Sequence, residues 1–181
     1  QKLDKDGKGM VDEKGNPIME NRSYSQTEVV TVPGMGEMLA IENSSGQQRL
    51  IPKSDADLMN KLGEEQYQKN LQDKMAWIKE HRNVEGKSEE DIKKWAEASI
   101  GTSEQDANSY LRSITEGRAR LNDARQVLRQ NGVDVYNKPV TAEDMKKLKE
   151  TNHLGYEQLV SKYGEKGVLK MMNTISANTG E

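Results

Sequence analysis

The 181-residue chain contains no cysteine, no phenylalanine and only 4% aromatic residues. The absence of cysteine excludes a disulfide scaffold, thiol chemistry and a cysteine-ligated zinc site. No apolar run approaches the roughly 18 residues that a membrane-spanning helix requires. Leu, Ile, Val and Phe together stay below the roughly 20% at which chains struggle to build a core. The composition therefore predicts a chain without a membrane span and with a thin hydrophobic core.

The chain is rich in charge of both signs. Charged residues make up 31% of it, and 27 Lys and Arg against 30 Asp and Glu leave a net charge of -3. Intrinsic disorder combines low hydrophobicity with high net charge, and the second property is missing here. A thin core with balanced charge favours extended, solvated helices that a partner could complete. Because the sequence contains no recognisable catalytic motif, we expect no enzyme activity, no metal and no cofactor.

Residues 1–53 differ from the rest of the chain and predict a small antiparallel sheet or arm. Strand-like runs at 27–32, 37–42 and 47–51 are separated by Pro-Gly-Met-Gly and Asn-Ser-Ser-Gly, which are strong turn signals. Connections this short join neighbouring antiparallel strands, so the simplest arrangement is a three-stranded meander. A further hairpin is expected around 10–19. Segment 1–9 has one apolar residue, Leu3, and we expect it to be mobile.

Residues 54–181 predict a helical domain, because four short patterns have the form of helix starts. A Ser or Thr followed by acidic residues occurs at Ser54, Ser88, Ser103 and Thr141. Such a hydroxyl caps the first free backbone amides, and the carboxylates face the positive end of the helix dipole. The expected helices cover about 55–82, 89–100, 104–130, 142–150, 154–163 and 166–176. The first is expected to loosen at Gly63, so the third is expected to be the longest uninterrupted helix. We therefore predict an α+β protein that is mainly α, with a small N-terminal sheet followed by a multi-helix region with one long helix.

The expected third helix carries a heptad pattern. Its apolar residues recur every seven positions from Ala107 to Leu128, and a second set follows three places later at Tyr110, Gly117 and Ala124. One interpretation is a plain bundle helix packed on its own domain. The other is a seam with a partner helix, whose backbone the small residues would let approach closely. If the face is a seam, the partner-binding residues are Tyr110, Ile114, Gly117, Arg118, Leu121, Arg125, Leu128 and Arg129.

Arginine side chains along this helix bear on the kind of partner. Arg118, Arg125 and Arg129 flank the apolar face, and a rigid guanidinium fork can grip phosphate or carboxylate. Nucleic-acid binding normally brings a basic domain with interleaved aromatics, whereas this chain is slightly acidic and has no Phe. A protein partner or a homo-oligomer is therefore favoured over nucleic acid.

Together these features predict a non-enzymatic structural or assembly protein, a subunit or fragment of a larger non-covalent complex such as a virion or phage structural component. The main alternative is an adaptor or regulatory module that binds a protein or nucleic acid through the Arg-edged helix. A third interpretation is a hydrolase, because Asp and Glu residues that folding brings together need not show a recognisable spacing in the sequence. The chain begins with Gln1 and shows no secretory leader, so we expect a processed product, an excised domain or part of a longer chain. Its location is undetermined, with the cytoplasm or the interior of an assembly favoured.

Overall fold

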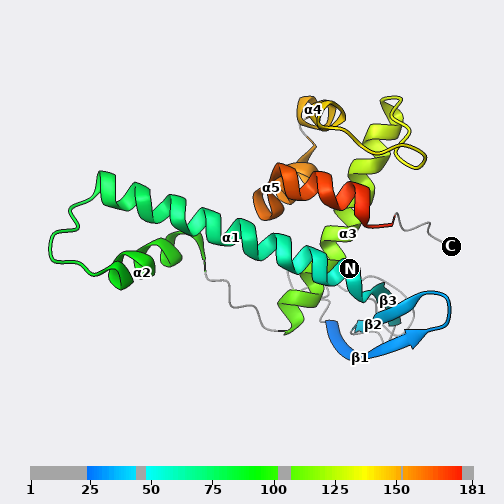
Figure 1. Ribbon diagram of the computed structural model, residues 1–181, viewed down its shortest axis with the longest axis horizontal. Coiled ribbons are helices and arrows are strands. Elements are labelled where there is room, and N and C mark those ends of the chain that lie inside the picture. Colours follow the sequence, from blue (N-terminus) through cyan, green and yellow to red (C-terminus); the bar gives the residue numbers. More distant parts are fainter. Residues whose placement is uncertain (1–23, 44–47, 102–106, 152, 177–181) are drawn as a thin grey trace, which may run out of the picture.

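The structure is a computed structural model that describes residues 24–43, 48–101, 107–151 and 153–176. Within these residues a small sheet precedes five helices (Figure 1), which confirms the predicted α+β class with mainly α content. The predicted mobile segment 1–9, the predicted hairpin at 10–19 and Ser103 lie outside the described residues. The elements are β1 (Tyr24–Val32), β2 (Gly36–Asn43), β3 (Gln48–Pro52), α1 (Lys53–His81), α2 (Glu89–Ile100), α3 (Ala107–Gln130), α4 (Ala142–Glu150) and α5 (Leu154–Thr174).

The sheet is an antiparallel meander with the strand order β1-β2-β3, as the turn signals predicted. The turn between β1 and β2 requires glycine, because Gly34 and Gly36 have φ angles of 78° and 80°, which other residues rarely adopt. The central strand β2 is buried between Met38 and Ile41. Through Leu39 and Ile41 it joins the main hydrophobic core, so the sheet closes one end of the helical body.

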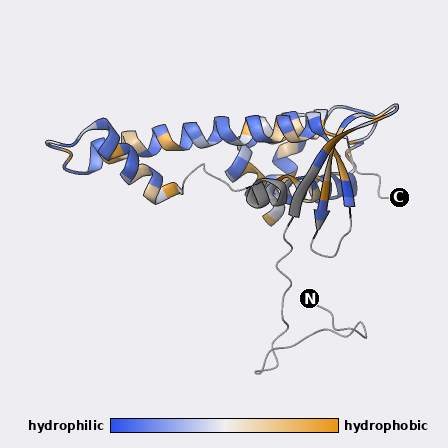
Figure 2. Cartoon of the chain, turned by 90° about the horizontal axis from the view of Figure 1, so that it is seen from below, coloured by the Kyte–Doolittle hydropathy of each residue, from blue (hydrophilic) through white to orange (hydrophobic). Residues whose placement is uncertain are grey.

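The helical body consists of α3, α4, α5 and the first half of α1. Helix α3 contacts α1, α4, α5 and β1, and therefore lies at the centre of the packing. Figure 2 shows α1 running along the molecule from the sheet at one end towards a helical hairpin at the other. The most deeply buried large side chains of the main core are Ile41 of β2 and, in the helices, Met59, Leu121, Leu128, Leu148, Leu159, Val168 and Met171.

Helix α1 is the longest described helix, with 29 residues against 24 for α3, so the expectation that the third helix is longest is wrong. The predicted cap at Ser54 is also wrong. Helix α1 begins at Lys53, with Pro52 at the N-cap and no side-chain cap hydrogen bond. Strand β3 leads directly into the helix through Pro52, whose ring fixes φ at -52° and which has no N–H to satisfy.

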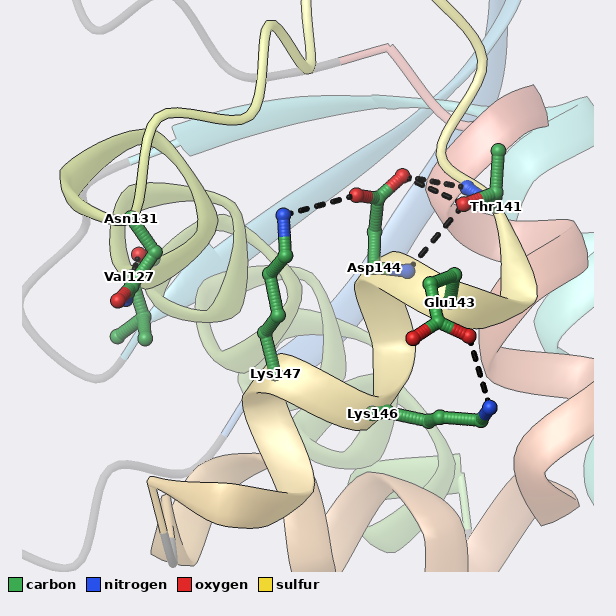
Figure 3. A network of polar contacts seen from close by, with 7 residues as sticks. All are labelled: Val127, Asn131, Thr141, Glu143, Asp144, Lys146 and Lys147. Atoms are coloured by element: carbon green, nitrogen blue, oxygen red, sulfur yellow. Dashed lines mark hydrogen bonds and ion pairs between the residues drawn. The ribbon is translucent and has the colours of Figure 1, made fainter.

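Helices α2 and α4 begin where the sequence predicted, each with a capping box. At α2, the backbone N of Asp91 donates to Ser88 Oγ at 3.1 Å, and the backbone N of Ser88 donates to Asp91 Oδ2 at 3.0 Å. At α4 the same two bonds join Asp144 and Thr141 at 3.2 and 3.0 Å (Figure 3). Hydrogen bonds from Thr141 lower the pKa of Asp144, as those from Ser88 lower the pKa of Asp91. Each box satisfies two amides that a helix start otherwise leaves unpaired.

Helix α5 is interrupted at Gly164, where the sequence predicted the junction of two shorter helices. Gly164 has φ 70° and ψ 158°, and Gln66 Oε1 lies against the position that a Cβ would take, so only glycine fits. A side-chain clamp then fixes the last turn of α5. The amide of Asn173 accepts from the backbone N of Val140 at 2.7 Å and donates to its carbonyl at 2.9 Å.

Candidate protein-interaction site

The heptad face of α3 is buried inside the chain. Ile114, Leu121 and Leu128 are 2%, 0% and 0% exposed and belong to the main core. Gly117 packs just as tightly, because a Cβ there would meet side chains of α1 and α5 at 2.5 and 3.1 Å. The chain's own helices therefore occupy the seam that the sequence had left open to a partner, and the described side chains fit the bundle-helix interpretation.

Two of the flanking arginines are buried and bonded within the chain. Arg118 is 6% exposed and forms an ion pair with Asp55 of α1, which is 7% exposed. Arg125 is 3% exposed and donates to the carbonyls of Met172 and Ile175 at the end of α5, with 2.9 Å to the first. Burial lowers the pKa of Arg125 from its ordinary value. A buried charge needs such partners, because removing one partner of a buried pair costs about 3–5 kcal/mol.

The remaining predicted residues do not form a cationic surface either. Arg129 is exposed and lies over the ring of Tyr136, with 5.2 Å between the guanidinium carbon and the ring centroid. Arg120, which is not among the predicted partner-binding residues, pairs with Glu116 one turn earlier on α3, at 3.5 Å. Tyr110 belongs to α3, but its side chain is outside the described part of the chain. Among the described arginine side chains of α3, Arg118, Arg120 and Arg125 are therefore all bonded within the chain.

The structure instead reveals a surface feature that the sequence did not predict. Helix α2 and the outer half of α1 project from the body as a helical hairpin (Figure 1). We call this hairpin the arm; it is distinct from the N-terminal sheet or arm predicted for residues 1–53. The arm has a small hydrophobic core of its own, separate from the main core. A hydrogen bond from Tyr67 Oη to the carbonyl of Gly101, at 3.1 Å, closes its base. The buried side chains of the arm core are Leu71, Ile78, Ile92 and Ala96, with Tyr67, Met75, Val84 and Trp95 packed against them.

Trp77 is the largest apolar side chain exposed on the arm. It is 43% exposed, stacks on His81 with 4.9 Å between ring centroids, and has Lys74 Nζ 4.4 Å from its own ring centroid. Both tryptophans of the chain lie on the arm, because Trp95 belongs to α2. The sequence did contain a signal for this exposure, since Trp77 falls off the helical stripe of Leu71 and Ile78 that faces inward.

The described residues show no site for metal chemistry. No group of His, Asp and Glu among them could hold a metal ion, and no helix among them is long and apolar enough to cross a bilayer. The two histidines have local contacts: His153 Nδ1 accepts from the backbone N of Tyr156 at 3.1 Å, and His81 stacks on Trp77. Across the described ranges, every buried side-chain nitrogen or oxygen has a hydrogen-bond partner.

Comparisons of the chain with protein-family models, with curated proteins and with solved structures gave no match. The geometry of the residues is therefore the basis for any functional conclusion.

Proposed function

We propose that this chain is a non-enzymatic structural or assembly protein, a subunit of a larger non-covalent complex, and that the arm contacts a neighbouring copy. The observation that carries the proposal is the projecting arm with Trp77 on its surface. An exposed tryptophan offers a large apolar surface, and tryptophan is enriched among the residues that dominate interface energies. Among the described residues, α2 packs chiefly on α1 rather than on the body, so both helices of the arm have surface available for contact.

An adaptor that reads a partner through the Arg-edged helix has less support. Arg118 and Arg125 are bonded to Asp55 and to the end of α5, so they are not available to an external phosphate or carboxylate. Freeing either guanidinium would leave buried groups unpaired, which costs several kcal/mol. An interface on the arm requires no such rearrangement.

Sedimentation velocity across a range of concentrations tests the proposal. We expect the intact chain to reach masses above its 20.4 kDa monomer as concentration rises. A variant in which a short Gly-Ser linker replaces residues 68–100 should remain a monomer and keep the far-ultraviolet CD signal of the body helices. The deletion is feasible because the Tyr67 side-chain hydroxyl reaches the carbonyl of Gly101, so the two backbones lie within the length of a tyrosine side chain, which a short linker can span.

A point variant with a matched control separates the role of Trp77 from the loss of the arm. Trp77→Gln should weaken self-association by about thirtyfold or more, the usual effect of removing a tryptophan hot spot. Tyr136→Gln is the control, because Tyr136 is an exposed aromatic residue of the body, at 52%. An intact chain that stays at the monomer mass at every concentration would refute the proposal, as would equal effects of the two variants.

A further inference from the structure

A groove of about 760 Å³ lies between α1 and α5, where α5 is interrupted. Its lining includes the apolar side chains of Leu62, Val160 and Tyr163, which belong to or pack against the main core. Gly164 is also part of the lining, so the second half of α5 begins at the groove. The positive end of a helix dipole favours negative charge within the first turn. The groove thus combines an apolar surface with a helix start.

Positive charge gathers along the rim of this groove. Lys69 of α1 and Lys166 and Lys170 of α5 all line it. Within the described part of the chain, none of these three lysines has a carboxylate partner. The unpaired lysines therefore leave the rim with an excess of positive charge.

The acidic residues of the groove are already paired with lysines outside it. Glu65 lies 3.9 Å from Lys61 on α1, and Glu165 lies 3.3 Å from Lys149 of α4. With these two partner lysines counted, five ammonium groups lie around two carboxylates, so the groove keeps an excess of positive charge although the whole chain carries a net charge of -3.

We propose that this groove binds an acidic peptide segment that carries an apolar side chain. The lysines complement the carboxylates of such a segment, and the apolar lining complements its hydrophobic residue. The volume lies within the roughly 300–1,000 Å³ of sites that hold a compact ligand. The groove is open to solvent, so a small molecule would stay less covered than the roughly 70–90% usual for ligand sites. A peptide can continue beyond the groove along α1 and α5 and gain further contacts. This site is separate from Trp77, so its test does not depend on the arm interface.

Fluorescence anisotropy with a labelled peptide of sequence EEDLLEDE tests the inference, with the uncharged QQNLLQNQ as the comparison peptide. We expect the intact chain to bind the acidic peptide, to bind it more weakly as salt rises, and to bind the uncharged peptide poorly. The variant Lys166→Gln with Lys170→Gln should weaken binding of the acidic peptide by about three- to thirtyfold, the effect of two solvent-exposed ion pairs. Gln has nearly the helix propensity of Lys, so the fold should be unaffected.

The matched control is Lys94→Gln with Lys146→Gln, which makes the same change in net charge on exposed helix surfaces outside the groove. It should leave binding of the acidic peptide unchanged. Equal weakening in both double variants would show that net charge rather than the groove attracts the peptide, and would overturn the inference. Displacement of the peptide by millimolar inorganic phosphate alone would also overturn it, because the site would then be one for small anions. Failure of the acidic peptide to bind in low salt would likewise overturn the inference.

Discussion

The arm should unfold as a separate unit, and Ile78→Ala is the substitution that tests this most directly. Ile78 is 1% exposed and belongs to an arm core with only four buried side chains. Replacing a buried isoleucine by alanine costs about 2–5 kcal/mol. The three large side chains of the arm core contribute about 1.5–3 kcal/mol each before the entropy of ordering is subtracted. The loss is therefore comparable to the whole net stability of the arm, and we expect the arm to open while the body stays folded.

Two optical probes separate the arm from the body in a urea titration. Both tryptophans lie on the arm, so tryptophan fluorescence reports its unfolding alone. Far-ultraviolet CD reports chiefly the body, which holds most of the helical residues. In the Ile78→Ala variant, the fluorescence transition should move to lower urea and precede the CD transition, which should keep most of its amplitude.

Leu128→Ala is the matched control, because Leu128 is 0% exposed but belongs to the main core. Leu128→Ala should shift the CD transition to lower urea, whereas the fluorescence transition that reports unfolding of the arm should move far less. If both probes shift together in Ile78→Ala, the arm and the body are one cooperative unit. That result would refute the separation of the two cores as an energetic boundary.

Three further predictions concern single sites. Asp55→Ala should lower the free energy of unfolding by about 3–5 kcal/mol, because it removes the carboxylate that pairs with the buried Arg118 guanidinium. The double variant Asp55→Leu with Arg118→Met should recover most of that loss in urea titrations. A double variant no more stable than Asp55→Ala would contradict this. Gly63→Ala should stabilise α1 by about 0.5–1 kcal/mol, because a Cβ there makes an ordinary contact at 3.5 Å. Gly117→Ala should destabilise the fold by about 1–3 kcal/mol, because Met59 and Tyr163 already fill the position of its Cβ. Shifts of the melting temperature in opposite directions would confirm both. The pKa of Asp144 is held below its ordinary value of 3.8, chiefly by the hydrogen bond from the Thr141 hydroxyl, so the cap stabilises the fold fully above pH 3.8 and loses this effect as the pH falls further. Asp144→Asn should therefore flatten the acidic end of the profile of melting temperature against pH. An unchanged profile would count against the cap.

Features that depend on a few adjacent residues could be predicted from the sequence. The capping boxes at Ser88 and Thr141 involve atoms within four residues, so the hydroxyl and carboxylate pattern is sufficient to place the helix starts. The break at Gly164 and the turn before β2 follow from glycine, the residue that tolerates positive φ. Antiparallel order followed from the short connections between strands.

Features that depend on distant residues could not be predicted. The Ser54 cap failed because Pro52 joins strand and helix directly, while Asp55 pairs with Arg118, which lies 63 residues further along the chain. The face of α3 was recognised as apolar, but its period does not tell whether the covering helix belongs to this chain or to another. The arm was missed for the same reason, since the sequence does not show that the buried side chains of the outer half of α1 pack on α2 rather than on the body.

The bond from Arg125 to the end of α5 has a consequence during synthesis of the chain. Met172 follows Arg125 by 47 residues, so α3 leaves the ribosome well before the helix that covers it. At about 5–20 residues per second, the part of α3 that α5 covers stays uncovered for roughly two to nine seconds. The arm is encoded earlier and needs nothing beyond α2 to complete its core. A nascent chain therefore carries a folded arm and an open body at the same time, and that interval is when chaperones or misassembly would act on α3.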